Sequence, residues 1–407
     1  MSKNELGTQE LAPMANTPRL GRGFIQDPHS LYRRLRLEAP VHRVRVWGGN
    51  YAWLVTRYTE ARALLADARL SKNWDELVKF GNSGAHNSVL NSHMLQQDPP
   101  DHTRLRRLVT TAFTAGSVQK MRPDICRIAD KLLDRVAESG AAGVVDLMQS
   151  YAVQLPLRVI SELLGVPARD RDNFRTRVET LLTSIDPNEL RATESALIDL
   201  LAEWIEQKRG HPADDLLSAL VHASDVADRL STDELLATAF LLVLAGYETT
   251  VNLIGNGVLA LLRNPSQLAT LRADLSLMPT AVEEFLRFES PLNTATTRFT
   301  TKSVRVGEVE IPAGQLVVVS LLAANHDDRR YDNPDRLDVT RRPNPHLAFG
   351  HGIHHCLGAP LARLEGEIAI GRLLTRFERI TLDSGASLQY RNSTLMRGLT
   401  ALPVWIS

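Results

Sequence analysis

The chain has 407 residues, enough for one large domain or two ordinary ones, and its formal net charge of zero gives no sign of a nucleic-acid partner. Two cysteines at this length exclude a disulfide framework and favour a reducing cytosol, so a cytoplasmic protein is expected.

Residues 1–20 are polar and lack the apolar core of a signal peptide, so a disordered leader is expected there. No repeat or long linker interrupts the remaining sequence, and residues 21–407 are predicted to form a single domain. An irregular segment over 71–95 has a length typical of a working loop. The elements before it are predicted to be a helix, a two-stranded hairpin turned at Gly48-Gly49 and a second helix, over His29–Glu38, Val41–Val46, Tyr51–Thr56 and Tyr58–Ala66.

Helical periodicity dominates from Arg104 to about Gly210, and another helix is predicted over Asp214–Ala223. Two short helices and a strand-rich stretch are expected near the end of the chain. The sequence therefore predicts a mainly α fold with a smaller β region. Breaks within the long helical stretch are expected at Pro123, Gly140, Pro156, Gly165-Val166-Pro167 and Asp186-Pro187, and strands over Arg298–Thr300, Val304–Ile311 and Leu316–Ser320.

The most apolar segment begins at a capping box, Ser-Thr-Asp-Glu over 231–234, and ends before Asn264-Pro265. Glu248, Asn252 and Asn256 interrupt its apolar surface, so a buried core helix is favoured over a membrane span.

The sequence Ala245-Gly-Tyr-Glu-Thr-Thr250 lies inside this long helix. Its small residues leave space against a flat ligand, and a threonine hydroxyl at 249 or 250 can bond back to the carbonyl four residues earlier. A buried acid at Glu248 is costly unless it is used or paired. A kinked helix with a satisfied glutamate is the structural alternative.

Two further motifs place charged residues on one helix face. His102 and Arg106, which follow a diproline stop, are four residues apart and repel each other unless they share an anion; a solvated basic helix is the alternative. Glu284 and Arg287 are three residues apart, which suits an ion pair and is often only a surface pair.

A glycine-rich loop delivers Cys356 to the start of a segment with helical period. Unpaired backbone N–H groups and the helix dipole favour its thiolate. Three interpretations compete: a buried structural cysteine, a zinc site that includes His351, His354 and His355, or a thiolate ligand for haem iron. Cys126 lies in a helical run and is expected to pack as a small apolar residue.

The pattern Phe349-x-x-Gly-x-His354-x-Cys356-x-Gly358 resembles the cysteine-ligand signature of the cytochrome P450 family. The resemblance implies a triangular prism of helices around a buried haem b, with the Cys356 thiolate as axial iron ligand. It also implies that Ala245 lies against the haem and that Glu248 and Thr249 are the acid–alcohol pair that manages protons. His102 with Arg106, and Arg298 with His354, would hold the two propionates, and Arg336 would complete a buried network with Glu284 and Arg287.

The implied activity is monooxygenation: hydroxylation or epoxidation of a medium-to-large hydrophobic natural product, such as a polyketide of secondary metabolism, with dioxygen. Electrons would come from a ferredoxin and its NAD(P)H-dependent reductase, and a monomer without membrane partners is expected. The alternatives are a peroxygenase, an oxidative coupling enzyme, or a haem-binding sensor or recruitment module. A basic docking patch for an acidic ferredoxin is predicted on the cysteine side, with ordinary solubilising charges as the alternative; its arginines are Arg104, Arg107, Arg341, Arg342 and Arg363. By analogy, the substrate side would be lined by 71–95, 168–205, Leu241–Ala245, Leu292–Thr296 and Thr394–Met396.

Overall fold

The computed structural model describes residues 17–46, 50–74, 92–183, 186–225 and 230–407. Most of the expected leader, the glycine turn of the first hairpin and most of the irregular segment 71–95 therefore lie outside the described residues. The last residues of the expected leader belong to the fold, because Arg19 forms a β-bridge with Arg45 and Leu20 is buried.

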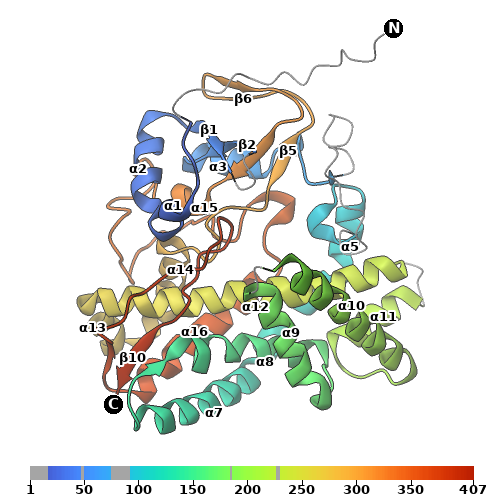
Figure 1. Cartoon of the computed structure of the whole chain (residues 1–407), viewed down its shortest axis with the longest axis vertical. Coiled ribbons are helices and arrows are strands. Elements are labelled where there is room, and N and C mark those ends of the chain that lie inside the picture. Colours follow the sequence, from blue (N-terminus) through green and yellow to red (C-terminus); the bar gives the residue numbers. More distant parts are fainter. Residues whose placement is uncertain (1–16, 47–49, 75–91, 184–185, 226–229) are drawn as a thin grey trace.

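The fold is built around α12 (Thr232–Arg263), a helix of 32 residues that crosses the molecule (Figure 1). Its predicted capping box is present: the Ser231 hydroxyl accepts from the Glu234 N–H, and the Glu234 carboxylate accepts from the Ser231 N–H. By length and composition α12 could cross a membrane, yet 78% of its most apolar window is buried in the protein. It is a core helix, as its interrupted apolar surface predicts.

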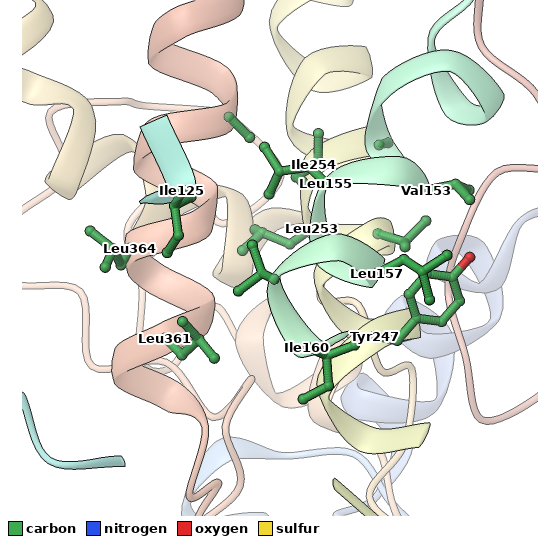
Figure 2. Close-up of a cluster of buried hydrophobic side chains, with 14 of the residues drawn as sticks. Ile125, Val153, Leu155, Leu157, Ile160, Tyr247, Leu253, Ile254, Leu361 and Leu364 are labelled. Atoms are coloured by element: carbon green, nitrogen blue, oxygen red, sulfur yellow. The ribbon is translucent and has the colours of Figure 1, made fainter. Parts of the chain in front are cut away.

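The main core forms where helices pack around α12, chiefly α7 (Arg122–Gly140), α8 (Gln154–Leu164), α14 (Met278–Phe288) and α16 (Ala359–Arg376). Figure 2 shows part of this core, in which Leu155, Leu253 and Leu361 come from three different helices and share one buried cluster. The packing of α16 against α12 fixes the end of α16 that follows the cysteine loop.

The helices not yet named complete the mainly α architecture. The breaks expected at Pro123 and Pro156 are present, because each proline lies in the first turn of a new helix, α7 or α8, where no helical N–H partner is lost. The remaining helices are α1 (Arg22–Gln26), α2 (Pro28–Glu38), α3 (Tyr58–Leu65), α5 (Asp101–Thr110), α6 (Ala115–Lys120), α9 (Arg171–Thr183), α10 (Pro187–Gly210), α11 (Leu216–Asp225), α13 (Pro265–Ala273) and α15 (Leu321–Asn325).

The strands lie mostly on one side of α12, as Figure 1 shows for β1, β2 and β5. A mixed sheet has the order β1-β2-β8-β5-β3, in which the predicted hairpin β1–β2 is antiparallel and β2 pairs in parallel with β8. Its strands are β1 (Val41–Arg45), β2 (Tyr51–Val55), β8 (Leu316–Val319), β5 (Arg298–Thr300) and β3 (Leu70–Ser71).

The structure also has two smaller sheets, and the first of them corrects an expected strand. The run Val304–Ile311, expected as one strand, is a hairpin of β6 (Val304–Val306) and β7 (Val309–Ile311) that turns at Gly307, whose φ is +59°. A positive φ is readily adopted only by glycine, so Gly307 ends the first strand. The third sheet joins β4 (Val145–Asp146), β10 (Pro403–Ile406) and β9 (Ile380–Leu382).

Candidate active site

A largely apolar pocket lies between α12 and the cysteine loop, with further walls from α5 and the turn 291–298. Of the segments expected on the substrate side, Leu241–Ala245 and Leu292–Thr296 contribute lining residues, as do Met94 and Leu95 from the end of 71–95. Within the described part of the chain, 168–205 and Thr394–Met396 contribute none.

Backbone geometry presents Cys356 to this pocket. Gly352 has a φ of +76°, and a Cβ atom there would lie 2.8 Å from the Leu65 carbonyl oxygen, so only glycine fits. The Cys356 N–H donates to the Phe349 carbonyl at 2.9 Å, and the N–H groups of Gly358 and Ala359 point to the sulfur at the start of α16. The sulfur therefore lies at the positive end of a helix, as expected from the sequence.

The electrostatics of the thiol are less favourable to ionisation than the sequence suggested. Burial raises the pKa of Cys356, although the Gly358 and Ala359 N–H groups and the cations Arg106 and Arg363 oppose the rise. Cys356 is nonetheless open to the pocket. A bound metal cation would supply the missing stabilisation, since a coordinating thiol is deprotonated.

Two other residues of the loop shape the space beside the sulfur. Gly358 lines the pocket, and a Cβ atom built on it would lie 3.9 Å from the Cys356 sulfur, an ordinary van der Waals contact. Phe349 lines the pocket, and the Arg363 guanidinium lies 4.5 Å from the centre of its ring.

The four residues expected to hold propionates form one cluster at the pocket wall. The rings of His102 and His354 are 4.5 Å apart, so the two predicted pairs are neighbours. Arg106 donates to the His355 carbonyl at 2.7 Å and Arg298 to the Leu65 carbonyl at 2.8 Å. Both ring nitrogens of His102, Nε2 of His354 and Nε of Arg298 are buried without a hydrogen-bond partner among the described residues.

Lys72, which the sequence did not single out, joins this cluster. It is 2% exposed, lines the pocket and donates to the Thr296 hydroxyl at 2.5 Å. Burial, together with Arg298, lowers its pKa to about 7. No local pattern in the sequence could have found Lys72, because its place beside Arg298 depends on the pairing of β3 with the distant β5.

On the opposite wall, the Thr249 hydroxyl donates to the Ala245 carbonyl at 2.9 Å, and both residues line the pocket. Thr250 makes the same back-bond to Gly246 at 3.4 Å. Glu248 is buried outside the pocket lining, and burial raises its pKa while Arg391 opposes the rise. The predicted pair is thus adjacent in sequence, but of the two only Thr249 faces the pocket.

A second buried acid, Glu365 of α16, was missed. It lines the pocket, and its Oε2 atom has no hydrogen-bond partner among the described residues. Burial raises its pKa well above the ordinary value, so the group is held in its protonated form.

The expected buried network is present with one changed member. Glu284 and Arg287 are fully buried and form a bidentate ion pair at 2.7 and 2.8 Å. The Arg336 side chain is exposed, and this residue contributes only its carbonyl, so its predicted role is wrong. Arg341 takes the place instead, donating to Glu284 at 3.2 Å. Asn344 also donates to Glu284, and the network therefore anchors the segment leading to the cysteine loop.

Most of the arginines expected to form a basic docking patch are instead paired with acidic residues of the same chain. Arg341 is in the buried network, Arg104 pairs with Glu234 at 2.5 Å, and Arg363 pairs with Glu283 at 2.6 Å. Arg342 donates to the Thr280 hydroxyl. Arg107, the fifth of these arginines, is exposed and takes no part in these contacts.

Zinc is not supported in the cysteine loop. Within the described residues, no three histidine, cysteine, aspartate or glutamate side chains converge as a metal site. Cys126, expected to pack as an apolar residue, lies against the main core.

Comparison with known proteins gives the family. The family model described as "Cytochrome P450" matches residues 178–397. Cytochrome P450 monooxygenase PikC of Streptomyces venezuelae is 45% identical over 407 residues, covering 99% of this chain and 97% of that protein. The chain belongs to the cytochrome P450 family.

Other relatives agree with this P450 assignment. Vitamin D(3) 25-hydroxylase of Pseudonocardia autotrophica is 47% identical over 383 residues, or 94% of each chain. The solved tirandamycin C-bound P450 monooxygenase TamI has a TM-score of 0.87 and 46% identity, covering 96% of this chain and all of that one. The predicted family, P450 fold and monooxygenase class are therefore confirmed, and the P450 family implies a haem iron with a thiolate ligand.

The pocket residues fit a haem. The one cysteine in the pocket lining supplies the thiol, while the unpartnered nitrogens of His102, His354 and Arg298 lie where acidic groups of a cofactor would satisfy them. Small residues, Ala245 and Gly246, face the same space from α12. This donor set matches a flat dianion with a central metal cation.

Proposed function

We propose that this P450 binds haem b through the Cys356 thiolate and inserts one oxygen atom of dioxygen into a hydrophobic natural product. The observation that carries the proposal is the arrangement of one pocket. Its lining includes the Cys356 thiol, the cation and histidine cluster, and the Thr249 hydroxyl. A thiol, anion-binding groups and a proton-handling alcohol around one space together suit a haem monooxygenase better than a structural cysteine.

The haem, when bound, supplies the chemistry that activates dioxygen. The chain holds it in place: Cys356 ligates the iron, while His102, Arg106, Arg298 and His354 bind the propionates. Phe349 and Gly358 shape the loop around the sulfur, and Ala245 leaves room on the facing side.

Proton handling falls to Thr249. The Thr249 hydroxyl donates its hydrogen bond to the Ala245 carbonyl, so the oxygen lone pairs are free to accept a hydrogen bond from water in the pocket. Glu248 acts behind it as the acid. Burial raises its pKa above the ordinary value, which favours a carboxyl group that can hold a proton and pass it on.

For substrate, we propose a medium-to-large hydrophobic molecule, with a polyketide of secondary metabolism as the leading class. The support is the apolar lining from Leu241, Leu292 and Met94. We further propose a cytoplasmic monomer that receives electrons from a separate ferredoxin and its reductase. With most of the expected arginine patch paired internally, such a partner would meet the exposed Arg107 and the outer edges of the ion pairs.

The carbon monoxide difference spectrum of the dithionite-reduced protein tests the central claim. The wild type is expected to show the red-shifted thiolate band, and Cys356→Ala to lose it together with turnover. Cys126→Ala is the matched control and should keep both, since Cys126 packs against the core away from the pocket lining. A wild-type protein without the band, or Cys356→Ala with persistent turnover, contradicts the proposal.

Turnover products then separate the alternatives. Monooxygenation requires reductase, ferredoxin and dioxygen and yields a product with one added oxygen atom. A peroxygenase would run on hydrogen peroxide alone, and a coupling enzyme would yield a product without added oxygen. A sensor or recruitment module would bind haem and show no turnover.

A further inference from the structure

Sheet register places two buried cations directly opposite each other at the pocket wall. Strand β3 pairs antiparallel with β5 through Leu70 with Thr300 and Ser71 with Phe299. The next residues in that register are Lys72 and Arg298, and both side chains are buried and line the pocket. Like charges directly across a strand pair are destabilising unless something compensates them.

The nearby acid Asp98 binds the backbone at Lys72 and the preceding side chain, and not the Lys72 ammonium group. The Asp98 carboxylate accepts from the Ser71 hydroxyl and from the Lys72 backbone N–H at 3.3 Å. The Lys72 ammonium has three donors, and among the described residues it donates to the neutral Thr296 hydroxyl. Asp98 therefore anchors the backbone, and the ammonium charge is directed into the pocket.

The charges around Lys72 do not balance within the protein. The nearby His93 adds no charge at pH 7, because burial lowers its pKa to about 4. The pKa of His102 is lowered by burial and by Arg106. When Lys72 is protonated, three cations (Lys72, Arg106 and Arg298) face one carboxylate (Asp98), and two propionates would balance the remaining positive charge.

We propose that Lys72 is a third cationic ligand for the haem propionates, acting beside Arg106 and Arg298. The inference rests on the proposed haem function, and assigns to Lys72 a part in retaining the cofactor. When a propionate is present, the Lys72 ammonium binds it and the repulsion across β3 and β5 is offset. Buried charge-assisted hydrogen bonds are strong enough for the loss of one to change retention of a ligand by about tenfold.

Haem release from the holoenzyme to excess apomyoglobin tests the proposal. Lys72→Met is expected to release haem about tenfold faster than wild type and to have a more negative midpoint potential, because a nearby positive charge favours the reduced state. Lys72→Arg should restore most of the retention. Lys131→Met, an exposed lysine of α7, removes a charge far from the pocket lining and should match the wild type.

Two further arms keep the result unambiguous. Thr296→Val removes the hydroxyl that accepts from the Lys72 ammonium. Haem release as fast as in Lys72→Met would show that the lysine merely holds the turn, and would overturn the proposal. Unchanged release in Lys72→Met, with a loss of the spectral shift caused by fatty acids, would overturn it in favour of an acidic substrate. In either case a wild-type thiolate band keeps the proposed haem function intact, so the two failures are distinguishable.

Discussion

At the scale of single residues, Glu248 and Thr249 are adjacent in the sequence but lie in different surroundings. Thr249 faces the pocket, whereas Glu248 is buried behind it in a setting that raises its pKa. The threonine hydroxyl already uses its proton on the Ala245 carbonyl, so it can only accept from a pocket water. Substitutions at 249 should therefore affect proton delivery without affecting haem retention.

Removing this hydroxyl gives a prediction at the same scale. Thr249→Ala is expected to keep the thiolate carbon monoxide band while at least half of the consumed NAD(P)H appears as hydrogen peroxide, because the pocket loses its proton-positioning oxygen. Thr249→Ser keeps a hydroxyl and should stay near wild-type coupling. The measurement is peroxide and product per NAD(P)H oxidised. Unchanged coupling in Thr249→Ala would assign proton delivery to the substrate or to another group.

At the scale of elements, the network that holds the segment before the cysteine loop shows what sequence spacing can miss. Glu284 and Arg287 share a helix turn, so their pairing follows from the i, i+3 rule. The third residue of the network lies on a segment without regular structure. No periodicity in the sequence there predicts whether the side chain of Arg336 or that of Arg341 is buried. Arg341 is 12% exposed and Arg336 is exposed, a difference set by the path of the backbone.

A pair of matched substitutions follows. Arg341→Met should lower the free energy of unfolding by about 3 kcal/mol, because it leaves the buried Glu284 carboxylate with one cation fewer. Arg336→Met should change it by less than about 0.5 kcal/mol, since only the carbonyl of residue 336 is used. Urea unfolding of the two variants measures the difference. If Arg336→Met were the more destabilising of the two, Arg336 would be the third member of the network, as the sequence predicted.

At the scale of the whole molecule, one buried ion cluster joins both ends of the chain to its middle. Glu289, which follows α14, pairs with His29 of α2 at 2.9 Å and with Arg397 of the C-terminal loop at 3.0 Å. Arg397 also donates to the carbonyl of Ile25 in α1. Burial would raise the pKa of Glu289, but Arg397 and His29 outweigh burial and hold it well below the ordinary value.

A lowered folded-state pKa stabilises the fold above the unfolded pKa, near 4.5, and this contribution is lost as pH falls. Glu289→Gln should therefore cost about 3 kcal/mol at pH 7, with the difference from wild type shrinking below about pH 4.5. Glu378→Gln, an exposed acid near the end of α16, serves as the control and should have little effect at either pH. Chemical unfolding at pH 7 and pH 4 measures both. A difference that grows on acidification would contradict the pKa direction.

Much of this architecture was predictable from local patterns. The capping box at Ser231, the apolar helix that it opens and the pairing of β1 with β2 follow from short-range rules, and they were confirmed. The cysteine loop was readable because its glycines and its position before α16 are contiguous in the sequence. Lys72 and Glu365 were not, because their roles depend on which distant segments cover them.

The residues that line the pocket are synthesised at different times, because they lie far apart along the chain. Lys72 is made early in synthesis, Arg298 much later, and Cys356 close to the end of the chain. A cofactor that contacts all three of these residues can be fully bound only after Cys356 has been synthesised. Until then the positive charges of Lys72 and Arg298 lack the anionic partner proposed for them. In the proposed haem site, the residues that would bind the propionates are therefore made before the residue that would bind the iron.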